Sequence, residues 1–131
     1  MAGSVVLTAH NQIGHIRSLV YTCTADASAA TFPTEVLPAI EGRLLALATN
    51  PGSTAPTADY DITLVDQHGH DVLEGVGIDR HTSSTEKAAI VYSGTGTHPC
   101  VDGSDTLTLT IAGNAVNSAG TVVQLYYALG G

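Results

Sequence analysis

Apolar and polar side chains alternate along much of this chain at a spacing of two residues, which is typical of β-strands with one buried face. The alternation is cleanest over residues 106–112. There Leu107, Leu109 and Ile111 predict an inward face, and the threonines between them predict an outward face. We therefore predict an amphipathic strand over these residues.

Residues 59–73 carry the same alternation followed by a turn. Tyr60, Ile62 and Leu64 alternate with more polar neighbours, and the run Asp-Gln-His-Gly at 66–69 follows them. Asp can accept a hydrogen bond from its own backbone, and Gly can adopt a positive φ, so this run favours a turn. A second extended piece begins at Asp71. The stretch predicts a β-hairpin.

The rest of the chain predicts short strands separated by loops. Further strands are predicted over residues 4–8, 16–24, 43–49, 87–92 and 121–128, and one is expected to begin at Val101. Turns or loops are predicted over residues 10–15, 25–34, 50–57, 74–85, 93–98 and 113–120, with helical turns within 35–40 and 74–85. This pattern predicts an all-β fold, a β-sandwich or a jelly-roll-like barrel of about seven to eight short antiparallel strands. We expect residues 1–131 to form a single β-sandwich domain, with residues 1–15 as an extended N-terminal segment.

Two of the predicted strands are apolar on both faces, as in a strand that is buried on two sides or lies at an interface. In residues 43–49 the two faces are Leu45, Leu47, Thr49 and Leu44, Ala46, Ala48. In residues 121–128 they are Val123, Leu125, Tyr127 and Val122, Gln124, Tyr126. We expect Val122 and Tyr126 either to contact another subunit or to pack under a loop.

The charge of the chain excludes some classes of partner. Its 131 residues have a net charge of −8, and its only Lys and Arg residues are Arg17, Arg43, Arg80 and Lys87. Nucleic-acid binding needs clustered cations, and an anionic membrane surface repels an acidic protein, so we expect neither partner. The first residues lack the pattern of a signal peptide, and we expect synthesis in the cytoplasm with Cys23 and Cys100 reduced.

One local cluster has the residue types of a metal site. Asp66, His68, His70 and Asp71 lie close in sequence, and alternate positions of a strand would bring the two histidines to one face. The turn composition instead places them at a solvated hairpin tip. A calcium loop is less well matched, because further alternating oxygen ligands and a terminal Glu are missing. We predict no bound metal.

Catalytic patterns are equally weak. Ser83 and Ser84 lie near His81 and Asp79, but no Gly-x-Ser-x-Gly elbow accompanies them. The paired acids Asp59 and Asp61 are expected to be solvated, and the closely spaced glycines at 75, 77, 94 and 96 open no predicted helix that could hold a phosphate. We predict no catalytic residues and no cofactor, so the chain is expected not to be an enzyme.

The hairpin and its flanks resemble small structural proteins of tailed bacteriophages, of the type that decorates or cements the capsid. The resemblance covers about residues 42–128. It is carried by Asn-Pro-Gly at 50–52, Ala-Pro-Thr at 55–57, Tyr-Asp-Ile-Thr-Leu-Val-Asp at 60–66, Gly69, Asp-Val-Leu at 71–73, Gly75, Asp-Arg at 79–80, Leu-Thr-Leu-Thr-Ile at 107–111 and Gly-Thr-Val-Val-Gln-Leu-Tyr-Tyr at 120–127.

The resemblance implies a β-sandwich that sits on the outer shell of a virion and stiffens it. The implied partners are the major capsid protein and further copies of this chain, as a dimer or trimer. Segments 10–15, 25–40 and 50–57 are candidate grips. The candidate contact residues are Phe32, Val36, Leu37, Ile40, Val122 and Tyr126. Alternatively, the first four of these residues cap the domain's own core. The alternative function of the whole protein is a tail or surface module that binds a host glycan.

Overall fold

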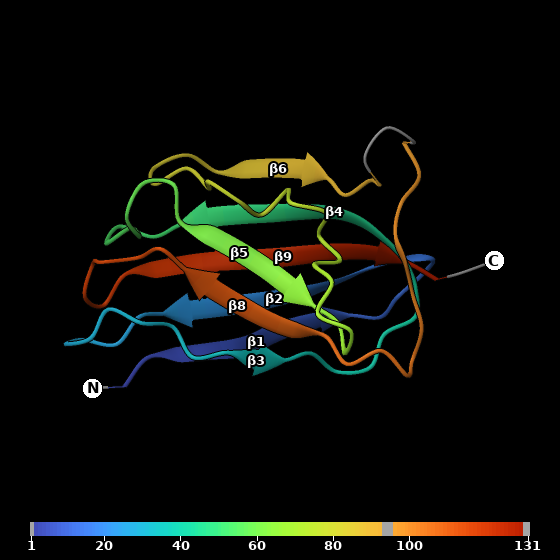
Figure 1. The fold of residues 1–131 in the computed structure, drawn as a ribbon, viewed down its shortest axis with the longest axis horizontal. Helices are drawn as coiled ribbons and strands as arrows, with labels where there is room; N and C mark the ends of the chain where they lie inside the picture. Colours follow the sequence, from blue (N-terminus) through green and yellow to red (C-terminus); the bar gives the residue numbers. More distant parts are fainter. Residues whose placement is uncertain (1, 93–95, 130–131) are drawn as a thin grey trace.

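The computed structural model describes residues 2–92 and 96–129, which form two antiparallel sheets packed face to face (Figure 1). Sheet A has the strand order β1-β2-β9-β4-β6, with β7 pairing β4, and sheet B has the order β3-β8-β5. The predicted all-β sandwich is confirmed. The strands are β1 Ser4–Asn11, β2 Ile16–Thr24, β3 Glu35–Val36, β4 Gly42–Pro51, β5 Asp61–Val65, β6 Glu86–Ala89, β7 Cys100–Val101, β8 Thr108–Ala112 and β9 Gly120–Ala128. Within the described ranges, no helix is long and apolar enough to cross a membrane.

Strand β9 lies at the centre of sheet A, between β2 and β4. Its side chains Val123, Leu125 and Tyr127 are buried in the core between the sheets. Because neighbouring residues of a strand point to opposite faces, Val122 and Tyr126 lie on the other side of the sheet, as the sequence predicted.

Sheet B covers the core from the other side. Leu109 and Ile111 of β8 are buried and lie opposite Leu64 and Ile62 of β5. The predicted amphipathic strand is thus confirmed from Thr108 onward.

The predicted hairpin over residues 59–73 forms only in part. Strand β5 pairs with β8, and its return arm makes a single bridge between Val65 and Asp71. Residues 71–80 then continue as successive turns along the free edge of β5. The Asp71 carboxylate accepts the backbone N–H of Leu64 at 3.1 Å, so a side chain takes the place of a second strand's carbonyl.

Two predicted helical turns are absent. Within residues 35–40, Glu35 and Val36 pair with β8 instead, and ladder bonds outweigh the local preference. Residues 74–85 contain hydrogen-bonded turns and no helix.

Several loop boundaries also differ. Strand β4 continues through Asn50 and Pro51, which we expected in a loop, because Pro51 lies at the strand end, where its missing N–H is tolerated. Strand β1 continues to Asn11, into the predicted turn over 10–15. Of the predicted loop over 93–98, residues 93–95 lie outside the described residues.

A β-bulge in β4 changes the faces that we predicted for that strand. The register shifts between Leu44 and Ala46. Leu44 and Leu47 therefore both point into the core, with 0% and 1% exposure, although strict alternation places them on opposite faces. Ala46 and Ala48 point outward.

Candidate interaction surface

The side of sheet A that faces away from the core forms an open surface, which we call the outer face. Each of its residues lies opposite another across the ladder: Tyr126 faces Ser18 and Ala46, and Gln124 faces Val20 and Ala48. The central part of the outer face consists of Ser18, Val20, Thr22, Ala46, Ala48, Asn50, Lys87, Ala89, Val122, Gln124 and Tyr126. Strand β1 adds Val6, Ala9 and Asn11, which lie opposite Thr22, Val20 and Ser18.

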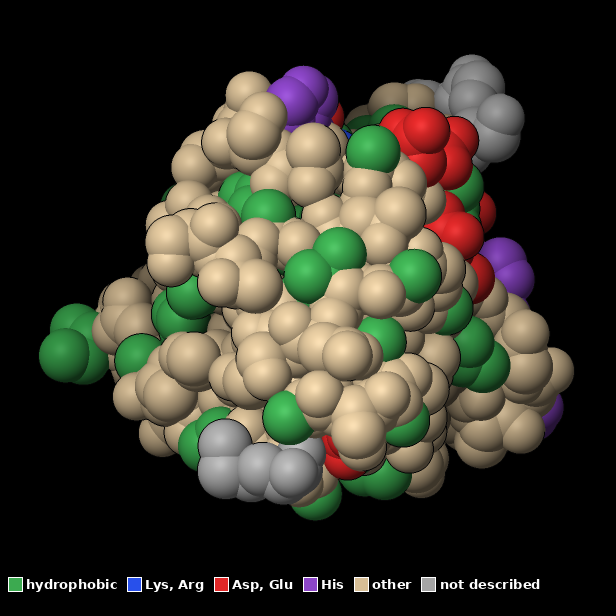
Figure 2. Space-filling model, turned by 90° about the vertical axis from the view of Figure 1, so that its left-hand side faces the viewer, with side chains coloured by type: hydrophobic (Ala, Val, Ile, Leu, Met, Phe, Trp, Pro, Cys, Tyr) green, Lys and Arg blue, Asp and Glu red, His purple; other side chains and the backbone are tan. Residues whose placement is uncertain are grey.

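The outer face carries no carboxylate, although the chain contains 12 Asp and Glu residues. Glu86 is the one acid within the strands of sheet A, and it lies opposite the buried Thr49, on the inner side. In Figure 2, which looks at one end of the sandwich, carboxylates gather on the right, toward sheet B, and none is visible along the left margin, toward sheet A. The acidity of the protein is thus confined to the rest of its surface.

Lys87 and Tyr126 form the main side-chain contact on the outer face. The Lys87 Nζ lies 4.1 Å from the centroid of the Tyr126 ring, within the range of a cation–π interaction. On the same face, toward β2, the Gln124 amide donates a hydrogen bond to the Ser18 hydroxyl at 3.2 Å. Neither Lys87 nor Gln124 was among the predicted contact residues. Gln124 could have been found from its place between Val122 and Tyr126 on a strand with two apolar faces, whereas Lys87 joins this face only through the pairing of β6 with β4.

Two shallow hollows flank Val122 on this face. One, of about 280 Å³, lies toward β4 and β6 and is bordered by Tyr126, Lys87 and Thr85. The other, of about 210 Å³, lies toward β2 and is bordered by Thr22 and Gly52. Both include Val122 and Asn50 in their lining. The outer face therefore has hollows that can receive small side chains of a partner.

The other predicted contact residues lie elsewhere. Phe32, Leu37 and Ile40 are buried in the sandwich's own core, at 8%, 7% and 5% exposure, which agrees with the alternative that they cap that core. Val36, on β3, is 57% exposed. A contact role is thus sterically open to Val36, Val122 and Tyr126.

The carboxylates of the Asp66–Asp71 segment accept backbone N–H groups. Asp66 Oδ1 accepts the N–H groups of His68 at 2.9 Å and His70 at 3.1 Å, and these bonds hold the pKa of Asp66 below its usual value. The His70 ring instead contacts the Glu74 carboxylate, which raises the pKa of His70. Over residues 2–92 and 96–129, no group of three or more His, Cys, Asp and Glu side chains is arranged to hold a metal.

The Ser83, Ser84 and His81 segment forms a local turn. His81 Nδ1 accepts the backbone N–H groups of Ser83 and Ser84, each at 3.0 Å. The Asp79 backbone N–H binds Asp61, on β5. The Ser83 hydroxyl also lies 3.3 Å from His81 Nδ1, and this nitrogen therefore faces two backbone N–H groups and one hydroxyl within a single exposed turn.

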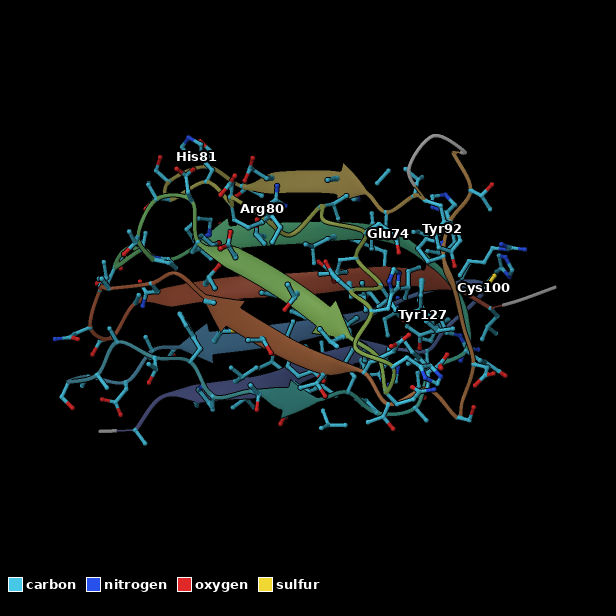
Figure 3. The ribbon with its side chains drawn as sticks, in the orientation of Figure 1. Glu74, Arg80, His81, Tyr92, Cys100 and Tyr127 are labelled. Carbon is cyan, nitrogen blue, oxygen red and sulfur yellow. The ribbon has the colours of Figure 1, made fainter. Side chains whose placement is uncertain are left out.

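The two cysteines occupy different environments and do not pair. Cys23, on β2, is buried, and burial raises the pKa of its thiol to about 12. Cys100 is exposed and lies 3.3 Å from the Arg43 guanidinium, so only Cys23 is a core thiol. Figure 3 shows Cys100 and Tyr127 at one end of the sandwich and Arg80 and His81 at the other.

A polar cluster closes the end of the sandwich near Arg80. The Arg80 side chain is 7% exposed, and its Nη2 lies 3.2 Å from Glu86 Oε1. Nearby, the buried Tyr60 hydroxyl bonds the Thr121 hydroxyl at 2.9 Å. One cavity inside the core, bordered by Tyr21, Leu47 and Leu109, has a volume of about 10 Å³, about what one water molecule needs, so this cavity is too small for an organic ligand.

No protein-family model matches the chain, and no curated protein matches it. A chain of the solved structure "Cyanophage Pam1 capsid asymmetric unit" is similar to it at 17% sequence identity, with a TM-score of 0.36, over 98% of this chain and 87% of that chain. At this TM-score the likeness carries no inference about the fold or the function.

Proposed function

We propose that this protein is a non-enzymatic structural component of a phage virion that binds the outer shell of the capsid and stabilises it. The observation that carries the proposal is the carboxylate-free outer face of sheet A on a molecule of net charge −8. The resemblance of residues 42–128 to capsid decoration proteins supports the same role.

The outer face suits docking on a large, rigid partner. Backbone ladder bonds hold β2, β9 and β4 in place, so little conformational entropy is lost when the face is covered. Its small and apolar side chains can be desolvated at low cost, whereas carboxylates cannot. We assign Val122 and Tyr126 to the contact with the major capsid protein.

A shell also multiplies weak contacts. Copies of this chain that associate with one another on a lattice bind through several faces at once, which yields tight attachment from modest single contacts. Val36 lies on sheet B, away from the outer face, and is assigned to a contact with a neighbouring subunit.

A glycan-binding tail module is the alternative function. Sugar sites usually contain exposed aromatic rings for stacking. Here Tyr92 is 38% exposed, and Lys87 already lies over the Tyr126 ring. The described residues thus offer this alternative little support, and it remains a prediction from the sequence.

Co-sedimentation with capsid shells that lack this protein tests the proposal. Wild-type protein is expected to pellet with the shells, and Val122→Asp, which places a carboxylate on the outer face, is expected to lose at least tenfold in affinity. The control is Ile78→Asp, which adds the same charge at an apolar residue of 42% exposure in the segment beside β5, away from the half-buried Val122. Equal loss in both variants, or no binding by the wild type, would contradict the assignment.

A further inference from the structure

The edge of sheet A at β1 is the sheet edge with the least protection. Exposed strand edges present unpaired N–H and C=O groups, and proteins normally blunt them with charges, prolines, short strands, β-bulges or covering segments. Strand β1 has eight residues, Ser4–Asn11, without a charged side chain or a proline. Apart from its ladder with β2, none of the described segments donates or accepts a backbone hydrogen bond with it.

The other edges are blunted. Strand β6 has only four residues, and they include Glu86 and Lys87. Strand β3 has two residues. The edge of β5 is covered by residues 71–80, whose carbonyl at Gly77 accepts the Ile62 N–H at 2.7 Å.

The charge distribution favours the approach of an acidic molecule at β1. All 12 carboxylates lie from Asp26 onward, so the segment that contains β1 and β2 carries none. A second copy of this chain, itself at −8, therefore meets no carboxylate on β1 or β2 themselves. Val6, in the N-terminal half of β1, is 50% exposed and would be covered.

We propose that two copies of this protein pair antiparallel through their β1 edges. A two-fold axis makes the pairing self-complementary, because each strand supplies the same donors and acceptors to the other. A β-bulge between Leu7 and Ala9 interrupts the edge, so we assign the pairing to residues 4–7.

The role that we give to this dimer, though not the pairing itself, rests on the proposed function. With the axis perpendicular to the sheet, the two sheets A join into one, and both outer faces point to the same side. A dimer of this kind presents two carboxylate-free faces to a shell together, so both can bind at once.

Sedimentation equilibrium of the protein without shells tests the pairing. We expect twice the chain mass of 13.4 kDa, and we expect Val6→Lys to raise the dimer dissociation constant at least tenfold. The control Ile78→Lys adds the same charge at a comparable exposure and should leave the constant unchanged. A monomer at all concentrations, a trimer, or a dimer insensitive to Val6→Lys would overturn the proposal.

Hydrogen exchange of the wild type provides a measurement that needs no variant. Backbone amides of residues 4–7 that point away from β2 should become protected as protein concentration rises, and concentration-independent exchange would contradict the pairing. Shell binding is measured separately. An intact dimer that ignores shells would contradict the proposed function alone, and a shell-binding monomer would contradict the pairing alone.

Discussion

The ammonium group of Lys87 on β6 lies 4.1 Å from the ring centroid of Tyr126 on β9. The two residues lie on the outer face of sheet A, on either side of β4, where Ala48 is opposite Lys87 and Ala46 is opposite Tyr126. An exposed pair of this kind contributes about 0.5–1 kcal/mol. Lys87→Glu removes the pair and puts a carboxylate on the face. We expect shell affinity to fall about tenfold or more, measured by co-sedimentation.

The control for net charge is Arg17→Glu. It changes the charge of the chain by the same amount, but Arg17 lies opposite Tyr127, on the inner side of the sheet, and its Nε donates to the Gly14 carbonyl. Shell affinity should change less in this variant than in Lys87→Glu. Equal effects would mean that overall charge, and not the outer face, governs binding.

Gly77 approaches β5 too closely for any side chain. A Cβ at this position would lie 2.1 Å from the Ile62 carbonyl oxygen, and the backbone there is held by the bond from the Ile62 N–H. Gly77→Ala is therefore expected to lower the free energy of unfolding by about 3 kcal/mol, measured by urea denaturation. Gly103→Ala, where a Cβ would meet nothing within 4 Å, should be close to neutral. A neutral Gly77→Ala would show that residues 71–80 do not cover the β5 edge as described.

The buried Arg80 depends on Glu86 for its charge partner. Two other nitrogens of its guanidinium, Nε and Nη1, have no hydrogen-bond partner among the described residues. Glu86→Ala leaves the cation buried and unpaired, at a cost of about 2–3 kcal/mol in unfolding free energy. Adding Arg80→Met to this variant should restore much of the loss, because a buried apolar side chain needs no partner. A double variant less stable than the single one would contradict this account.

Stability is expected to fall at alkaline pH through Cys23 and Tyr21. Burial raises the pKa of each to about 12, from ordinary values of 9.0 and 10.0. A raised pKa means that the unfolded chain loses the proton first, so the stabilisation is complete below pH 9 and is lost as the pH rises toward 12. Between pH 9 and 10 the fall in the free energy of unfolding comes mainly from Cys23, and its slope approaches about 1.4 kcal/mol per pH unit. Cys23→Ala should flatten that slope in urea denaturation curves, and an unchanged slope would assign it to other groups.

The sequence predicted the elements whose pattern is strictly periodic. The alternation around Leu109 and around Leu125 gave strands with the correct buried face, because side-chain direction in a regular strand follows the residue number alone. It failed at Leu44, where a bulge adds a residue to one face, since nothing in a run of Leu and Ala marks the position of a bulge. Strand β3 was missed because its two residues are held by pairing with β8 and not by local preference.

Part of the candidate surface could be predicted because alternation in a regular strand assigns each side chain to a face. Val122 and Tyr126 stood out because β9 is apolar on both faces. The buried state of Phe32, Leu37 and Ile40 could not be read from an irregular segment, where no period assigns a direction to a side chain. The absence of acids from the outer face depends on which strands are neighbours, and strand order is a tertiary property.

The most direct test of the central claim is to titrate purified shells that lack this protein with the wild-type protein, and to measure bound copies per major capsid subunit after sedimentation. We expect saturable binding at a simple ratio to that subunit. Absence of binding at every concentration, with the protein found on tails or missing from virions, would contradict it and favour the glycan-binding alternative.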